Sequence, residues 1–294
     1  MKQFFILTVF CLILSCKGYL YAQIAFVANP DDNWDLYIVS EDGSRLIRLT
    51  QTLYDEKDPS WSPDKTKIVY ATSTGQLKIV NMSTKETGHI AGDTNSPPKI
   101  NPAFSPSGEQ IAYVQLRPAS EGDDTDMMIW DLETWTLQRV LDQYTLQMWP
   151  AWSPDAKRIV YTSIHCSGEC GRMIQELWVT RSEGGWARQL TLTHSFCQQP
   201  VWSPDGKKIA FSSDKGGNFD IWILDLAAWK MEQVTFHEGM DVKPAWSPDG
   251  NKMAFVSSRS GIQEIWIKDL KTGKLSPLRP FGKKNIPCKD VAWL

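Results

Sequence analysis

Short apolar strands alternate with polar turns along most of the chain, and this pattern repeats. Runs of three mostly apolar residues follow a turn at 68–70, 111–113, 159–161, 209–211 and 253–255. Short runs rich in β-branched and aromatic residues between turn residues predict strands rather than helices. The chain is therefore expected to be an all-β protein built from many short strands.

The turn before each of these strands belongs to a repeat with the pattern Pro-x-aromatic-Ser-Pro. Its five copies begin 43, 48, 50 and 44 residues apart. They occupy residues 59–63, 102–106, 150–154, 200–204 and 244–248. Pro fixes φ, and the Gly that follows in some copies accepts positive φ, so the segment joins two strands tightly. A third strand recurs six times and a fourth follows several of them, which is typical of four-stranded propeller blades.

The two ends of the chain account for the sixth blade. Residues 291–294 form a first strand with nothing after it, and residues 24–27 form a second strand with nothing before it. Pairing them removes two exposed sheet edges. We predict a six-bladed β-propeller of antiparallel blades, closed by the N- and C-terminal strands in one blade and spanning 23–294 as a single domain.

Tryptophan recurs at matching positions of the repeat, and we predict that these side chains pack between blades. The set comprises Trp61, Trp152, Trp202, Trp246 and Trp293 in the first strands and Trp178, Trp222 and Trp266 in the third strands.

Residues 1–22 are predicted to be a signal peptide. Lys2 precedes an apolar run from Phe4 to Leu14 that is too short to span a bilayer. Residues 13–16 resemble a lipobox ending at Cys16, whereas Ala22 could precede an ordinary cleavage site. Both alternatives remain open, so the protein is expected to be periplasmic or otherwise exported, either lipid-anchored through Cys16 or cleaved after Ala22.

Charge and motifs exclude several classes of function. The formal net charge of −3 argues against a nucleic-acid partner, which would require a basic face. No later stretch is apolar enough for a transmembrane segment, and no Gly-x-Ser-x-Gly or phosphate-binding loop occurs. We predict no catalytic residue and no cofactor, and we expect a monomer.

A partner-binding site is predicted at one mouth of the central channel. The residues that immediately precede the first strand of each blade should line this mouth, and their side chains vary in chemistry. They are Asp58, Asn101, Trp149, Gln199, Lys243 and Asp290. Trp149 is the preferred anchor, because exposed tryptophan is frequent at binding hot spots.

Cysteines and histidines gather in loops of the same face. Cys166 and Cys170 are predicted to form a structural disulfide, because cysteines of exported proteins usually pair. A weaker alternative is a metal held by His165, His194 and Cys197.

The repeat of Trp-Ser-Pro-Asp-Gly followed by Ile-Ala-Phe, best seen at 202–206 and 209–211, resembles the TolB-type propeller. The resemblance covers 23–294 and implies a periplasmic protein that receives other proteins or peptides at a channel mouth, in TolB a peptidoglycan-associated lipoprotein. TolB carries an α/β domain before its propeller, and here the leader runs straight into the first strand. We therefore expect an envelope protein or peptide as partner, with a lipoprotein among the candidates, but not the contacts of that domain. The alternative is a saccharide- or metal-binding propeller with lyase or glycan-processing activity, since similar repeats occur in oligogalacturonate lyases.

Overall fold

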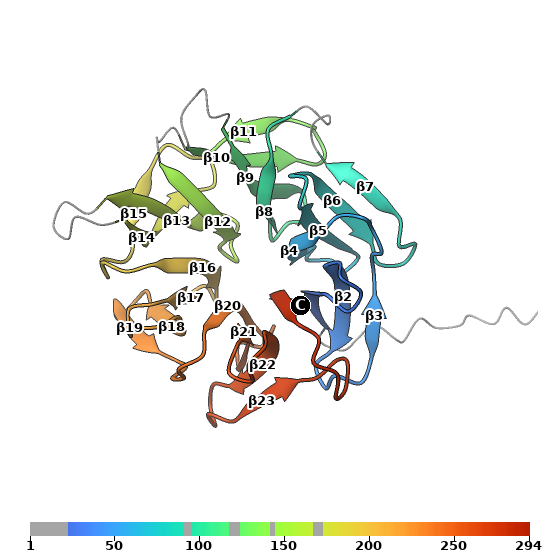
Figure 1. Cartoon of the computed structure of the whole chain (residues 1–294). Helices are drawn as coiled ribbons and strands as arrows, with labels where there is room; N and C mark the ends of the chain where they lie inside the picture. Colours follow the sequence, from blue (N-terminus) through green and yellow to red (C-terminus); the bar gives the residue numbers. More distant parts are fainter. Residues whose placement is uncertain (1–22, 91–95, 118–123, 142–144, 167–172) are drawn as a thin grey trace, which may run out of the picture.

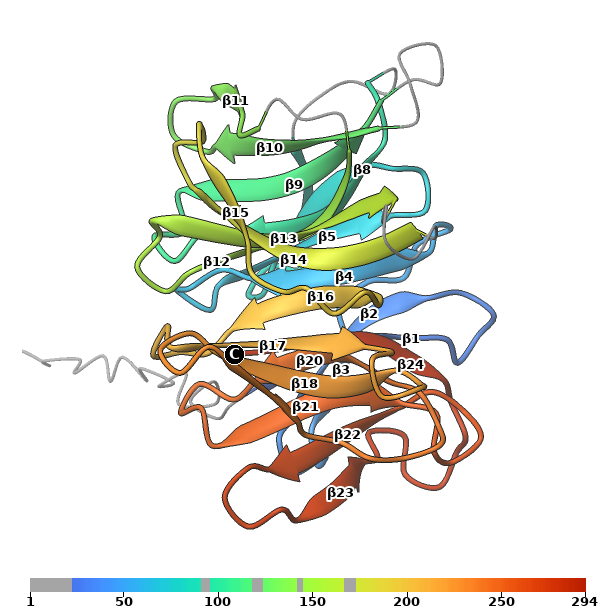
Figure 2. The same cartoon turned by 90° about the vertical axis from the view of Figure 1, so that its left-hand side faces the viewer.

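Six four-stranded antiparallel sheets surround a central axis in the computed structural model (Figure 1, Figure 2). The structure describes residues 23–90, 96–117, 124–141, 145–166 and 173–294, and within these ranges every regular element is a strand. The predicted six-bladed propeller is confirmed.

Each blade is named here by its order around the ring, and its strands are given from the channel outward. Blade one contains β24 (Cys288–Trp293), β1 (Gln23–Ala28), β2 (Asp35–Ser40) and β3 (Leu46–Arg48). Blade two contains β4 (Glu56–Trp61), β5 (Lys67–Thr72), β6 (Leu77–Asn81) and β7 (Thr87–Ile90). Blade three contains β8 (Lys99–Phe104), β9 (Gln110–Leu116), β10 (Thr125–Asp131) and β11 (Leu137–Arg139).

The remaining blades repeat this order. Blade four contains β12 (Leu146–Trp152), β13 (Arg158–Cys166), β14 (Met173–Arg181) and β15 (Ala187–Gln189). Blade five contains β16 (Cys197–Trp202), β17 (Lys208–Ser213), β18 (Asp220–Asp225) and β19 (Lys230–Gln233). Blade six contains β20 (Asp241–Trp246), β21 (Lys252–Ser257), β22 (Glu264–Asp269) and β23 (Leu275–Leu278).

The two ends of the described chain meet in blade one. The C-terminal strand β24 pairs antiparallel with β1, joining Ile24 to Trp293 and Ala28 to Cys288. In a further backbone hydrogen bond, Leu294 N–H donates to Gln23 O at 3.0 Å. The predicted closure is confirmed, and it supplies the inner strand that blade one would otherwise lack.

Apolar packing is concentrated between neighbouring blades rather than in one central core. Six clusters of buried apolar residues each combine side chains of two adjacent blades. In blade two, for example, Tyr70 faces blade one, whereas Val69 on the same strand faces blade three. Successive residues of a strand point to opposite faces, so each sheet is buried on both sides.

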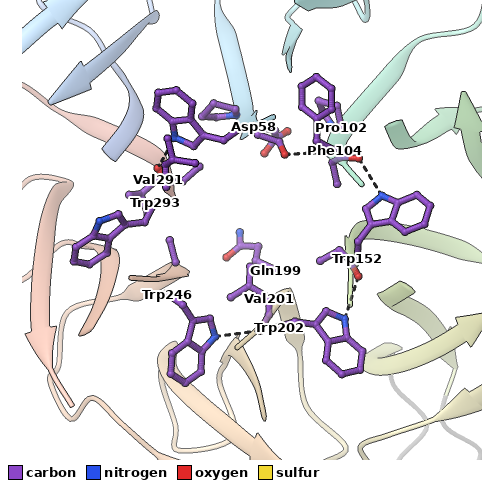
Figure 3. Close-up of a pocket in the computed structure, with 18 of the residues that line it drawn as sticks. Asp58, Pro102, Phe104, Trp152, Gln199, Val201, Trp202, Trp246, Val291 and Trp293 are labelled. Atoms are coloured by element: carbon purple, nitrogen blue, oxygen red, sulfur yellow. Dashed lines mark hydrogen bonds between the residues drawn. The ribbon is translucent and has the colours of Figure 1, made fainter. Parts of the chain in front are cut away.

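The inner-strand tryptophans also link the blades through hydrogen bonds. In four of the five inner-strand tryptophans of the repeat, the indole Nε1 donates to a backbone carbonyl of the preceding blade, as the dashed lines of Figure 3 show, whereas within the described residues Trp293 Nε1 forms no such bond. The pairs are Trp61 with Ala292 O at 3.3 Å, Trp152 with Ala103 O at 3.1 Å, Trp202 with Ala151 O at 3.2 Å and Trp246 with Val201 O at 3.3 Å. These four side chains are buried as predicted, whereas Trp293 and the third-strand tryptophans are half-buried.

We predict that deleting residues 288–294 abolishes the stable ring. The deletion removes β24 from blade one and leaves the apolar cluster between blades six and one open to water. Thermal unfolding followed by circular dichroism should show a midpoint lowered by more than about 10 °C. The deletion removes several buried side chains, each of which contributes to the free energy of unfolding, and each kcal/mol lost lowers the midpoint by about 2 to 4 °C. Removal of Leu294 alone is the control and should change the midpoint little. An unchanged midpoint in the longer deletion would contradict closure through β24.

Candidate functional site

A cavity of about 470 Å³ occupies the centre of the ring (Figure 3). Its wall comes from the inner strands β4, β8, β12, β16, β20 and β24 and from the turns that follow them. The repeated Pro-x-aromatic-Ser-Pro segments therefore form most of the channel wall.

All six predicted site residues line this cavity. Asp58, Asn101, Trp149, Gln199, Lys243 and Asp290 each come from a different inner strand. Their placement in the chain differs from the prediction, however. They lie inside the inner strands rather than immediately before them, because each strand begins two or three residues earlier.

A β-bulge in every inner strand explains this difference. In blade two, Lys57 pairs with Ala71 and Ser60 with Val69, so that two residues lie opposite Tyr70 alone. The same shift occurs in the other five blades, opposite another large buried aromatic residue. Those residues are Phe26, Tyr113, Tyr161, Phe211 and Phe255.

The first bulge residue is the predicted site residue in each blade, and its backbone is left-handed. The six φ angles lie between 51° and 56°. Left-handed backbone is unusual for residues other than glycine, and it ends the regular ladder at that point. A bulge re-aims the local side chain, and here it presents six different side chains to one cavity.

Neighbouring site residues satisfy one another around the mouth. Asp290 Oδ2 accepts the backbone N–H of Asp58 at 3.3 Å, and Asn101 Oδ1 accepts that of Trp149 at 3.4 Å. Gln199 Oε1 accepts the backbone N–H of Lys243 at 2.9 Å. In three of the six blades, the side chain of the bulge residue thus accepts the backbone N–H of the bulge residue in the next blade. The amide and acid side chains therefore also stabilise the bulges.

Lys243 forms the electrostatic centre of the mouth. Its Nζ pairs with Asp290 Oδ1 at 2.9 Å and with Asp58 Oδ1. Asn101 Nδ2 donates to the second oxygen of Asp58 at 2.9 Å. One ammonium group therefore pairs with two carboxylates on this side of the mouth, and Lys57 and Lys289 lie close enough to interact with the same carboxylates.

Burial and ion pairing act in opposite directions on these groups. Burial alone would lower the pKa of Lys243 and raise that of Asp58. The carboxylates of Asp290 and Asp58 outweigh burial at Lys243 and raise its pKa, and the ammonium of Lys243 lowers the pKa of Asp58. Both groups remain charged across the neutral range.

Trp149 lies on the cavity wall but is half-buried rather than fully exposed. It comes from β12 of blade four, whereas Lys243, Asp290 and Asp58 come from blades six, one and two. The mouth therefore combines an aromatic side with a charged side.

Exposed apolar side chains on loops of the same face were missed from the sequence. These loops lead from the outer strand of one blade to the inner strand of the next. Leu53 is 95% exposed, Phe236 71% and Leu192 67%, and Tyr54 and Met240 are also exposed. Leu192 and Phe236 occupy the same repeat position, directly after Thr191 and Thr235, whereas Leu53 does not share it. The repeat shows where these residues lie in the chain but not that their side chains are exposed.

Among the described residues, the predicted metal ligands His165, His194 and Cys197 do not come together in a group that could bind a metal ion. Within 23–90, 96–117, 124–141, 145–166 and 173–294, no group of three or more His, Cys, Asp or Glu side chains could hold a metal ion. Cys197 is buried near Glu176 and Thr193, and burial raises the pKa of its thiol to about 12. The backbone N–H of His194 donates to Glu176 Oε1 at 2.8 Å, and His165 lies on β13 opposite Ile174.

The predicted disulfide cannot be located, because Cys170 and the side chain of Cys166 lie outside the described residues. Cys197 and Cys288 are free and buried. The leader and Cys16 also lie outside the described residues. Within the described ranges, no helix long and apolar enough to cross a membrane is found.

Comparison with known families supports the same fold. The model of the TolB beta propeller domain matches residues 88–221 and 126–290, which together cover more than half of the chain. The chain belongs to the TolB β-propeller family. The resemblance predicted from the repeat is thus confirmed.

Individual TolB proteins match part of the chain. The Tol-Pal system protein TolB of Francisella tularensis subsp. mediasiatica is 31% identical over 132 residues, which are 42% of this chain and 30% of that protein. A TolB homolog of Chlorobium luteolum is 26% identical over 145 residues, 48% of this chain and 31% of that protein. Each match spans less than a third of the length of these relatives.

Solved structures extend the likeness of fold to nearly the whole chain. TolB from Acinetobacter baumannii superposes with a TM-score of 0.76 at 21% identity, over 92% of this chain and 66% of that one. A putative TolB from Agrobacterium tumefaciens gives 0.72 at 18% identity, over 93% and 98%. An oligogalacturonate lyase in complex with manganese gives 0.61 at 15% identity, over 86% and 73%. At these identities the likeness shows the propeller fold alone.

We predict that Lys243→Met destabilises the protein most strongly near neutral pH. The substitution leaves two mostly buried carboxylates without their cation, which should cost about 3 kcal/mol. Urea unfolding between pH 4 and 8 measures the effect, and Lys271→Met at an exposed turn is the control.

The pH dependence follows from the direction of each pKa shift. The lowered pKa of Asp58 adds stability above its ordinary pKa of about 4, and this is lost as the pH falls through the folded value. The raised pKa of Lys243 adds stability that is lost only at strongly alkaline pH. In Lys243→Met the ammonium is absent and burial raises the pKa of Asp58, so the variant binds a proton at a higher pH than wild type does and its uncompensated charge is removed. The difference in unfolding free energy between wild type and Lys243→Met should therefore narrow as the pH falls toward 4. A difference independent of pH would contradict the ion-pair explanation.

Proposed function

We propose that this propeller is a protein-binding module of the cell envelope that receives its partner, an envelope protein or peptide, at the channel mouth. The observation that carries the proposal is the set of exposed apolar side chains on the face that surrounds the mouth. Leu53, Leu192 and Phe236 are each more than half exposed. Large apolar side chains grouped on one face are typical of interaction surfaces.

The chemistry of the mouth suits a peptide. An extended segment offers backbone donors and acceptors together with side chains of mixed character. Gln199 is half-buried and its Nε2 can donate to the backbone of the segment, and Trp149 can pack against an apolar side chain.

Family membership favours the same function. The named relatives include Tol-Pal system protein TolB, and the resemblance implies a protein partner in the envelope. Location in the envelope in turn depends on residues 1–22, whose composition is that of an export signal.

Substitutions at the mouth face should remove partner binding without unfolding the propeller. We expect Trp149→Ala combined with Phe236→Ser to lose about tenfold or more in affinity, because both large side chains would be buried by the partner. Residues 23–294 are immobilised, envelope extract is passed over them, and mass spectrometry identifies proteins that wild type retains and the variant loses. The affinity for a purified candidate is then measured by calorimetry.

Lys271→Ala is the control, because Lys271 is exposed on a turn of blade six at the end of the strands opposite the mouth and belongs to neither proposed binding surface. The proposal requires a defined envelope protein that wild type and the control retain and the mouth variant loses. If wild type retains no such protein, or if the mouth variant retains it equally, binding at the mouth is wrong.

Export is tested separately. We expect Leu7→Arg combined with Leu12→Arg to keep the protein in the cytoplasm, since two charges disrupt the apolar run. Cell fractionation measures the change. The intact mass of the wild-type product distinguishes a lipid-modified chain that begins at Cys16 from a chain that begins at Gln23. Unchanged fractionation of the variant would contradict a signal peptide.

A further inference from the structure

Three tryptophans are exposed on the turns between the third and outer strands of three consecutive blades. Trp135 follows β10, Trp186 follows β14 and Trp229 follows β18. Their exposed fractions are 68%, 41% and 48%. Strands of a blade alternate in direction, so these turns lie on the face opposite the mouth. Blades three, four and five are neighbours, and their outer strands β11, β15 and β19 follow one another along the perimeter (Figure 1).

The fold does not require tryptophan at two of these positions. Trp135 and Trp229 have φ angles of 58° and 54°. The corresponding turn of blade six has Gly273 at 74°, and that of blade two has Lys85 at 58°. Glycine adopts this backbone without strain, whereas a bulky residue does so rarely. A large side chain that is both exposed and unfavourable for its backbone points to selection for binding rather than for folding.

Contacts between neighbouring blades connect the turns that carry the three tryptophans, so that the exposed indoles form one strip. Gln138 Nε2 on β11 donates to Glu183 O in the turn of blade four at 3.0 Å, which holds that turn against blade three. The guanidinium of Arg188 on β15 lies 4.7 Å from the centre of the Trp229 ring in blade five. Arg181 lies 5.9 Å from the centre of the Trp186 ring.

The rim strip is defined here by its six exposed members. They are Trp135, Leu137, Arg181, Trp186, Arg188 and Trp229.

The two arginines give the strip its charge. Within the residues that the structure describes, neither Arg181 nor Arg188 forms an ion pair, and both are exposed. Stacking on an indole orients a guanidinium while leaving its N–H edge available for a carboxylate. The strip thus presents two oriented cations on a chain whose formal net charge is −3.

We propose that the rim strip binds a segment of a partner protein that combines carboxylate and apolar side chains. Carboxylates of the segment pair with Arg181 and Arg188, and its apolar side chains pack on the three indoles and Leu137. Tryptophan and arginine are the side chains that most often dominate protein interfaces. A protein is favoured over a polysaccharide because Leu137 and the indoles offer apolar surface to the apolar side chains of a protein segment. An anionic membrane is disfavoured because its attraction needs a larger cluster of basic residues.

This site is independent of the channel mouth and of the function proposed for it. The two surfaces lie at opposite ends of the strands, and no member of the rim strip lines the cavity.

The test uses two double variants designed from the structure. Trp135→Gly with Trp229→Gly installs the residue that blade six already has at this turn. Arg181→Gln with Arg188→Gln removes the charges and keeps the length and polarity of the side chains. Trp149→Ala at the mouth is the control. The probes are synthetic 12-residue peptides that combine Glu and Asp with Leu, Ile and Phe, each matched by a peptide with Lys in place of every acid.

We expect acidic peptides, but not their lysine-matched partners, to bind wild-type residues 23–294 in fluorescence polarisation. Each rim variant should weaken this binding by about tenfold or more, and Trp149→Ala should leave it unchanged. Thermal unfolding checks that the glycine variant remains folded: glycine relieves the two left-handed positions, whereas loss of the edge-to-face contact between Trp135 and Trp130, whose ring centres lie 6.0 Å apart, acts in the opposite direction.

The proposal is overturned if acidic and lysine-matched peptides bind equally or if neither binds. It is also overturned if binding survives in both rim variants or is lost in Trp149→Ala. Oligogalacturonate and vesicles containing phosphatidylglycerol are tested in parallel. Binding of either one in place of the peptides, with the same dependence on the rim variants, would assign the strip to a saccharide or a membrane and would also overturn it.

Discussion

Burial of both faces of every blade is the constraint on which the rest of the structure depends. Successive residues of the central strands are apolar, so both faces of each sheet must be buried. Each blade therefore needs a neighbour on each side. Tyr70 and Val69 on β5 illustrate this, since they pack against blades one and three respectively. A row of such blades has unburied faces at its ends until it closes into a ring. Ring closure through β24 and β1 is therefore a requirement of packing and not an accessory feature.

Closure also determines the chemistry of the mouth. Six inner strands converge on one axis, and a bulge in each of them directs one side chain toward the cavity. Packing fixes a large aromatic residue opposite each bulge, whereas the bulge residue itself differs from blade to blade and in three blades binds the backbone of the next bulge. The ion-paired side chains of Lys243, Asp290 and Asp58 come from blades six, one and two, so they span the blade in which the ends of the described chain meet. The charged side of the mouth and the closure of the ring consequently depend on the same strand.

The sequence predicted the features that repeat and missed those that do not. The spacing of Pro-x-aromatic-Ser-Pro was sufficient for the blades, the ring closure and the buried positions of Trp61, Trp152, Trp202 and Trp246. It also identified six residues of the cavity wall, but it placed them before the strands, because a bulge at a residue such as Asp58 leaves no mark in the pattern of apolar residues. Leu53 and Phe236 lie at different places in two loops of equal length, 49–55 and 234–240, and the repeat does not predict whether a side chain in these loops is exposed. Binding by any of these residues is a question of chemistry that periodicity does not address.

The two ends of the blades offer different means of varying a surface. On the mouth face, loops such as 49–55 and 190–196 can change in length and composition, because they only connect one blade to the next. On the opposite face, the turns between third and outer strands keep a common backbone, with a left-handed residue in blades two, three, five and six. There the surface can change only through the identity of the side chain. Tryptophan at positions 135 and 229, where the same backbone holds Gly273 in blade six, is the kind of change that this constraint allows. A rigid ring that varies its two faces independently is suited to holding two partners at once.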